Sequence, residues 1–165
     1  MKLEWMGEYR DVVEALIHYC NIYAAAYKPE KMEYKGITYS YAQIQVIEYL
    51  LENEERHEHM AVIANRLGIT RSNFSKIVSR LCDKKLLEKN YQAGSQKNME
   101  VTVLPLGREL YEDYSKIILR WHFSPMFEDL GKMSPEARGL MRDALFAAMK
   151  ESNYLKEQGL QKKDK

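Results

Sequence analysis

Apolar side chains recur at helical spacing through most of the chain. Near the N-terminus they step alternately by four and three residues, at Tyr9, Val13, Leu16, Cys20, Tyr23 and Tyr27. This heptad pattern predicts an amphipathic helix that ends before Pro29. Its apolar face, widened by Trp5 and Ile17, is larger than a lone surface helix needs, so the pattern predicts a helix shared with a partner chain.

The next helices carry recognisable start and stop signals. Residues 30–39 are predicted to be a connection, and Ser40 with Gln43 forms a capping box that begins the second helix. The third helix is predicted over residues 60–67, where Gly68 supplies a left-handed cap. Thr70 is a good N-cap for a fourth helix that continues to about Lys84.

The second half of the chain switches from helical to strand periodicity and back. Residues 87–91 and 99–103 alternate as two strands of a hairpin around a turn-like segment. Pro105 suits the first turn of a fifth helix whose apolar face extends to Trp121, and Ser134 begins a sixth. The pattern predicts a mainly α fold, a helix-turn-helix followed by a β-hairpin wing, with long helices at both ends.

The helix-turn-helix meets the steric requirements of that motif. Ala64 is small where two helices cross, and Gly68 permits the tight turn. The fourth helix then presents short polar and basic side chains of the kinds that reach base edges and phosphates in a major groove. The candidate DNA-binding residues here are Thr70, Arg71, Ser72, Asn73, Ser75, Lys76 and Arg80.

The overall charge hides a strong local asymmetry. The 165 residues have a formal net charge of +1, which by itself does not suggest a nucleic-acid partner. Residues 70–97, however, hold seven Lys and Arg against two carboxylates, whereas residues 48–58 hold five carboxylates against one Arg. A basic stretch that coincides with the turn motif and hairpin indicates DNA binding.

Composition and motifs narrow the class of protein further. The chain is 45% hydrophobic, enough for a packed core, and no apolar run reaches the ~18 residues of a spanning helix. Two cysteines are too few for a disulfide framework, so a reducing cytoplasm is expected. We find no phosphate loop, nucleophile elbow or paired carboxylates, and we expect neither enzymatic activity nor a cofactor.

The chain resembles the MarR family (multiple antibiotic resistance regulators). The resemblance rests on residues 63–73 (IANRLGITRSN), 77–87 (IVSRLCDKKLL) and 103–107 (VLPLG), and on the order of the helices around the wing. It implies one MarR-like domain, with a winged helix at 40–107, dimerisation helices at 1–39 and 108–153, and a frayed tail at 154–165. It also implies a homodimer that binds a pseudo-palindromic operator in double-stranded DNA, as a repressor that responds to a small effector.

Three departures from the family pattern concern the wing and its surroundings. The wing usually carries Asp-x-Arg, whereas this chain has Ser95-Gln96-Lys97, so Lys97 is the candidate wing contact without an acid to orient it. Lys85 replaces the usual Gly after the recognition helix, and Leu104 replaces a capping Thr. The recognition helix is therefore expected to contribute most of the DNA binding.

Tyrosines are concentrated before residue 50. They fill either the core and the dimer seam or, as the resemblance implies, an aromatic cleft that receives a small phenolic or lipophilic effector. The candidate pocket residues are Tyr19, Tyr23, Tyr27, Tyr41 and Trp121.

Three alternative functions are considered beside an effector-responsive DNA-binding regulator. Cys20 could serve as a redox-sensing thiol, although on an apolar seam a free cysteine is usually a small hydrophobe. His57 and His59 lack the further ligands of a metal site, so a solvated loop is the preferred interpretation and no metal is expected. A winged helix that binds a protein instead of DNA is the remaining alternative.

Overall fold

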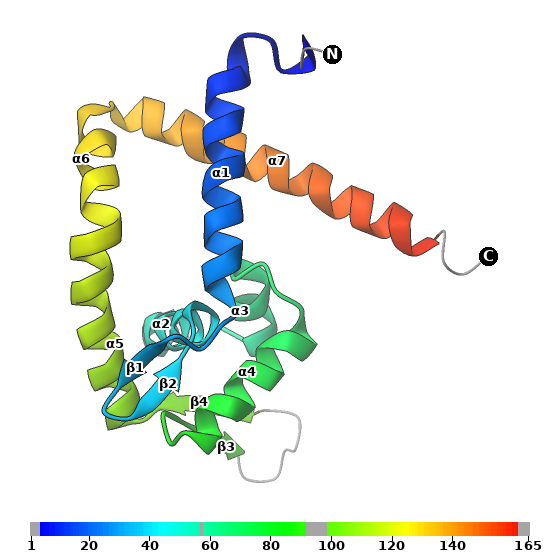
Figure 1. Cartoon of the computed structure of the whole chain (residues 1–165). Coiled ribbons are helices and arrows are strands. Elements are labelled where there is room, and N and C mark those ends of the chain that lie inside the picture. The colour runs from blue at the N-terminus through cyan, green and yellow to red at the C-terminus, as the bar shows by residue number, and fades with distance from the viewer. Residues whose placement is uncertain (1–3, 57, 92–98, 162–165) are drawn as a thin grey trace. The chain divides into compact units, whose positions relative to one another are not determined.

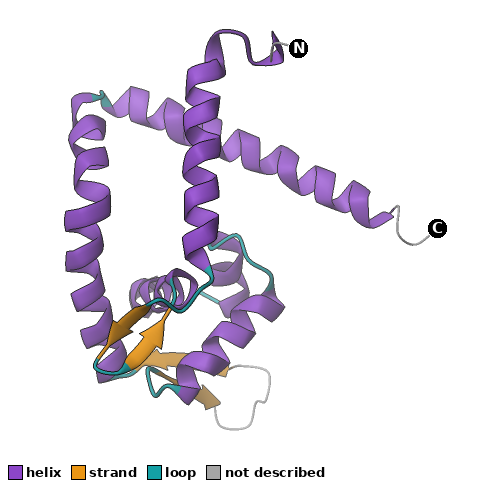
Figure 2. Ribbon diagram, viewed as in Figure 1, coloured by secondary structure: helices purple, strands orange, loops and turns teal. Residues whose placement is uncertain are grey.

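The computed structural model describes residues 4–56, 58–91 and 99–161. The chain divides into two compact units, residues 1–114 and 115–165, which we describe separately. The first unit contains the predicted winged helix, and its helices and strands can be followed in Figures 1 and 2.

A long helix and an unpredicted hairpin begin the first unit. A 3₁₀ turn, Glu4–Tyr9, broken at Gly7, precedes α1 (Arg10–Tyr27). The expected connection at 30–39 is instead an antiparallel hairpin of β1 (Met32–Tyr34) and β2 (Ile37–Tyr39). Lys35 and Gly36, at φ 48° and 80°, form its two-residue turn. Short aromatic and β-branched segments on either side of an x-Gly pair were the signal for this hairpin.

The predicted helix boundaries around the turn motif are confirmed. The capping box begins α2 (Tyr41–Arg56): the Ser40 hydroxyl accepts from the Gln43 amide, and the Gln43 side chain accepts from the Ser40 amide, each at 3.3 Å. After α3 (Met60–Arg66), Gly68 has φ 67°, as a left-handed cap requires. The Thr70 hydroxyl accepts from the Asn73 amide at 3.1 Å and caps α4 (Arg71–Asp83).

The wing and α5 complete the first unit. The predicted strands are β3 (Leu87–Tyr91) and β4 (Met99–Val103), paired antiparallel from Leu87 opposite Val103 to Tyr91 opposite Met99. Pro105 begins α5 (Pro105–Ile118), as predicted. An added Cβ on Gly107 would meet the Leu86 carbonyl oxygen at 2.5 Å, so only glycine lets α5 approach the turn before β3 this closely.

An apolar core joins these elements. Its fully buried side chains come from α2, α3, α4, the turn before β3, β3 itself and α5: Ile44, Val46, Ile47, Ile63, Val78, Leu81, Leu86, Leu87 and Leu110. Burial of each such side chain contributes roughly 1.5–3 kcal/mol. The core therefore fixes α4 against α2 and leaves the opposite side of α4 exposed.

The second unit holds one more helix than predicted. A turn of π-helix, Leu119–Phe123, leads into α6 (Ser124–Lys132), which the sequence prediction missed although Ser124-Pro125 repeats the start signal of Ser134-Pro135. The Ser134 hydroxyl accepts from the Ala137 amide at 3.2 Å and caps α7 (Pro135–Gln161). The helix α7 includes residues 154–161 of the segment expected to be a frayed tail, and the last four residues of that segment lie outside the described part.

Lys85 carries local strain that a glycine would remove. Its φ of 59° lies in the left-handed region, which costs roughly 1–2 kcal/mol for a residue with a Cβ. Glycine also increases the conformational entropy of the unfolded chain, which costs about 0.4–1 kcal/mol of stability. The strain energy removed from the folded state is larger than this entropic cost. We expect Lys85→Gly to raise the free energy of unfolding by about 0.5–1 kcal/mol in urea titrations.

The matched control lies two residues earlier. Asp83 is the last residue of α4. Asp83→Gly should lower the free energy of unfolding, because glycine weakens a right-handed helical residue by about 0.5–1 kcal/mol. Destabilisation by both substitutions would show that Lys85 is not strained.

Candidate nucleic-acid interface

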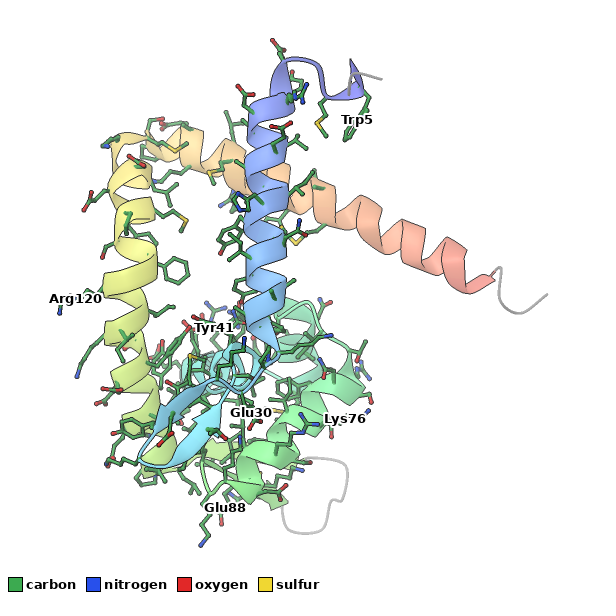
Figure 3. The ribbon with its side chains drawn as sticks, viewed as in Figure 1. Trp5, Glu30, Tyr41, Lys76, Glu88 and Arg120 are labelled. Atoms are coloured by element: carbon green, nitrogen blue, oxygen red, sulfur yellow. The ribbon has the colours of Figure 1, made fainter. Side chains whose placement is uncertain are left out.

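The exposed side of α4 carries the residues predicted to contact DNA. Phe74, Ile77, Val78 and Leu81 face the core and are buried. The side chains on the other side of the helix are exposed: Arg71, Ser72, Asn73, Ser75, Lys76 and Arg80. Figure 3 labels Lys76 on the outer side of α4. The structure thus places this predicted set on one surface, with Thr70 exposed at the start of the helix.

Three cations on this surface are free of carboxylate partners. Arg71, Lys76 and Arg80 form no ion pair with any residue in the described part of the chain. Their charge is therefore not neutralised within the fold. A surface of short polar side chains with unpaired cations can offer hydrogen bonds to base edges and charge to phosphates.

Other basic residues of this part of the chain are engaged within the fold. Arg66 pairs with Glu52 at 2.6 Å and Glu58 at 3.0 Å, and its guanidinium lies over the Tyr49 ring. The Lys89 ammonium donates to the Ser79 hydroxyl at 2.8 Å, which ties the wing to α4. Arg66, which precedes the basic stretch of residues 70–97, is thus paired with carboxylates, whereas Lys89 within that stretch is bonded to α4.

Lys84 belongs to the basic stretch of the sequence but is engaged within the fold. Its ammonium donates to the Glu30 carboxylate at 2.9 Å, the Thr38 carbonyl at 2.6 Å and the Gln43 side-chain oxygen at 3.1 Å. Glu30 precedes β1, and Figure 3 labels it between the β1–β2 hairpin and α4. The hydrogen bond from Lys84 lowers the pKa of the Glu30 carboxyl.

Four of the five predicted pocket residues lie in the first unit, where they meet around one ring. Tyr23 on α1 is the centre of a cluster, with ring centroids 6.0 Å from Tyr19, 5.4 Å from Tyr27 and 6.3 Å from Tyr41. The Gln45 amide donates to the Tyr23 hydroxyl at 2.5 Å. Burial raises the pKa of Tyr23 to about 12, so its hydroxyl is neutral at physiological pH.

Tyr114 extends this aromatic cluster to α5. Its ring packs edge-on against Tyr41 at 6.1 Å and Tyr39 at 6.4 Å, and burial raises its pKa. Sequence reasoning missed Tyr114 as a cluster member because helical periodicity marks it only as an apolar-face residue. Trp121 lies in the π-helical turn of the second unit, and its side chain is outside the described part.

The remaining predicted sites are placed as follows. Cys20 is exposed on α1. Lys97 and His57 lie outside the described residues. Within the described part of the chain, no group of three or more His, Cys, Asp or Glu side chains could hold a metal ion. No described helix is long and apolar enough to cross a membrane.

The sequence of the winged-helix part also matches a known protein family. The family model of the MarR family matches residues 35–94, from the β1–β2 turn to the wing. No curated protein sequence matches the chain. Residues 35–94 of this chain thus match the MarR family, in agreement with the resemblance predicted from the sequence.

Solved structures share the fold over most of the chain. The transcriptional regulator PcaV of Streptomyces coelicolor, in complex with its natural ligand, is 14% identical with a TM-score of 0.59, over 90% of this chain and 96% of that one. Wild-type ZitR of Lactococcus lactis, in complex with DNA, is 14% identical with a TM-score of 0.58, over 88% and 98%. BpsR of Bordetella bronchiseptica, whose DNA binding is regulated by 6-hydroxynicotinic acid, is 18% identical with a TM-score of 0.54, over 84% and 98%. At these identities, the likeness establishes the fold alone.

The lowered pKa of Glu30 predicts a pH-dependent contribution to stability. A carboxyl with a folded pKa below its usual 4.5 stabilises the fold above that value, and the contribution is lost as the pH falls through the folded pKa. We expect Glu30→Gln to be less stable than wild type at neutral pH in urea titrations. The two stabilities should converge as the pH falls through the folded pKa of Glu30, because the carboxyl is then protonated and uncharged, as glutamine is at every pH.

Glu33→Gln is the control for this experiment. Glu33 is an exposed carboxylate on β1, and it forms no ion pair with the described residues. Its substitution should leave the pH dependence close to that of wild type. A Glu30→Gln curve parallel to wild type from neutral to acid pH would show that the pair with Lys84 adds no stability.

Proposed function

We propose that this chain is a sequence-specific, DNA-binding transcription regulator that acts as a homodimeric repressor. The observation that carries the proposal is the exposed surface of α4, where short polar side chains accompany three unpaired cations. The N-terminal end of α4 suits a major groove, and the Lys89–Ser79 hydrogen bond ties β3 of the wing to the same helix. DNA complexes of similarly folded proteins, such as ZitR, support this assignment.

The proposed dimer follows from apolar surface that one chain leaves uncovered. None of the 18 residues of α1 is buried, and Val12 is 71% exposed. On α7, Leu140 is 73% exposed, and the stripe of Met141, Leu145 and Met149 is exposed as well. Apolar surface on two long helices favours association, because burial would remove it from water. Two recognition helices in a dimer would bind half-sites about one duplex turn apart.

The aromatic cluster around Tyr23 is the proposed location of effector binding. It joins α1 to α2 and α5, so a ligand that separates these rings would change how α1 is held. Small aromatic or lipophilic compounds match this lining. Such a ligand alters DNA affinity only to the extent that it binds the DNA-competent and incompetent arrangements differently.

The DNA-binding proposal is tested by reversing charge on α4. Duplexes selected from genomic fragments by the purified protein serve as ligands, and affinity is measured at two salt concentrations. We expect Lys76→Glu with Arg80→Glu to weaken binding by about a hundredfold or more, since each lost contact costs about 1–3 kcal/mol. Loss of two phosphate contacts should also reduce the salt slope by roughly two.

A charge-matched double variant outside α4 is the control. Lys132→Glu with Arg142→Glu makes the same change in net charge at two exposed positions of the second unit. It should bind within a few-fold of wild type. Equal affinity of wild type and the α4 variant would contradict the proposal and favour a winged helix that binds a protein.

Association is tested by light scattering at micromolar protein. Wild type is expected to be a dimer, and Met141→Glu with Leu145→Glu to be a monomer, because two carboxylates would be buried in the apolar interface without partners. Arg142→Glu, on the same helix but outside this stripe, should remain dimeric. A monomeric wild type would contradict the dimer.

A further inference from the structure

We infer that Glu30 and Lys84 are positioning residues for DNA recognition: their ion pair sets the C-terminal end of α4 relative to α1 and α2. The inference rests on the proposed DNA-binding function, since it concerns how the recognition helix is held. Glu30 lies between α1 and β1, and Lys84 is the C-cap residue of α4. Neither side chain belongs to the exposed surface of α4 described above.

The Lys84 ammonium has no hydrogen left for a phosphate. An ammonium group carries three N–H donors. Lys84 donates to the Glu30 carboxylate, the Thr38 carbonyl and the Gln43 side-chain oxygen. These three acceptors come from the segment before β1, from β2 and from α2. Lys84 therefore connects the end of the recognition helix to three other parts of the first unit.

The Glu30 carboxylate also accepts hydrogen bonds from residues other than Lys84. Besides Lys84, it accepts from the Gln43 side-chain amide at 2.6 Å and from the Thr38 hydroxyl at 3.3 Å. Gln43 is 2% exposed and also caps α2 through Ser40. One buried side chain thus bonds both members of the ion pair and the start of α2. The Lys84 and Glu30 side chains are 21% and 34% exposed, and four further hydrogen bonds with Thr38 and Gln43 restrain their geometry.

The covalent path from α1 to this pair is short. Tyr27, the last residue of α1 and a member of the aromatic cluster, is three residues before Glu30. Pro29 lies between them and restricts the backbone. A displacement of α1 is therefore transmitted to Glu30 and, through Lys84, to the end of α4. This places the ion pair between the proposed effector cluster and the recognition helix.

The sign of the effect of Glu30→Gln separates positioning from simple electrostatics. Removal of a carboxylate near DNA should strengthen binding if charge alone matters. If Glu30 positions α4, the same substitution should weaken binding to the selected genomic duplex, on the order of tenfold for the loss of a charged hydrogen bond. Affinity for a scrambled duplex of equal length should change little, because non-specific binding depends on charge.

A double-mutant cycle tests whether the two residues act as one unit. Glu30→Gln, Lys84→Met and the double variant are compared for specific and scrambled duplexes. All three should lose specific affinity to a similar extent, because either substitution alone already breaks the pair. Lys84→Arg, which can still reach a carboxylate, should recover part of the loss. Independent, additive effects of the two substitutions would overturn the inference.

Glu33→Gln is again the matched control, since it removes an exposed carboxylate three residues after Glu30 that does not pair with Lys84. It should bind the selected duplex as well as wild type or slightly better. If Glu30→Gln behaves like Glu33→Gln, the pair does not position α4. If Lys84→Met alone weakens binding and lowers the salt slope by about one, Lys84 is a direct phosphate contact instead.

Amide hydrogen exchange gives a readout that needs no DNA. The amides of Lys84, Lys85 and Leu86 donate to the carbonyls of Arg80, Cys82 and Leu81 and report the last turn of α4. Their exchange should be about tenfold faster in Glu30→Gln and unchanged in Glu33→Gln. Unchanged exchange in Glu30→Gln would overturn the inference. Faster exchange in a protein that binds no genomic duplex would instead refute the proposed function and leave the pair as a structural anchor.

Discussion

The packing of α4 against α2 is the constraint on which the functional surface depends. Ile44 and Ile47 of α2 and Val78 and Leu81 of α4 are almost fully buried in the shared core. A helix that buries one face in this way must present its other face to solvent, because its side chains repeat every ~3.6 residues. The polar and basic surface of α4 is thus a direct consequence of where its apolar residues lie.

The orientation of α4 also depends on a polar junction at its end. Lys84, Glu30 and Gln43 come from three segments that are distant in sequence and converge in the first unit. Such a junction has a definite geometry because each polar atom has a specific partner. It also changes the account of the charge: Lys84 counts toward the basic stretch in the sequence, but in the fold a carboxylate neutralises it.

The apolar faces of α1 and α7 are exposed, unlike the buried apolar face of α4. In α1, an apolar pattern is as clear as in α2, yet α1 has no buried residue and α2 has six. The exposed side chains of α7 repeat this contrast. Periodicity predicts which residues share a helix face, but the partner that covers the face is a property of an assembly. In the proposed dimer, a partner chain would cover the apolar faces of both α1 and α7.

The sequence alone determined the features that depend on neighbours along the chain. The capping box at Ser40, the turn at Gly68, the cap at Thr70 and the wing strands were all predictable, because each depends on residues a few positions apart. The hairpin at 32–39 and α6 carried similar local signals that were not recognised. The candidate residues on α4 were predicted as a set for the same reason.

Tertiary structure alone decided which charges remain available and which aromatic rings meet. Lys84 lies 54 residues from Glu30 in sequence, and Tyr114 joins a cluster with residues of α1 and α2. Sequence periodicity gives the face on which a side chain lies but not its distant partner. The unpaired cations of α4 and the engaged Lys84 look alike in the sequence. They differ because folding brings a carboxylate to one of them and leaves the others in solvent.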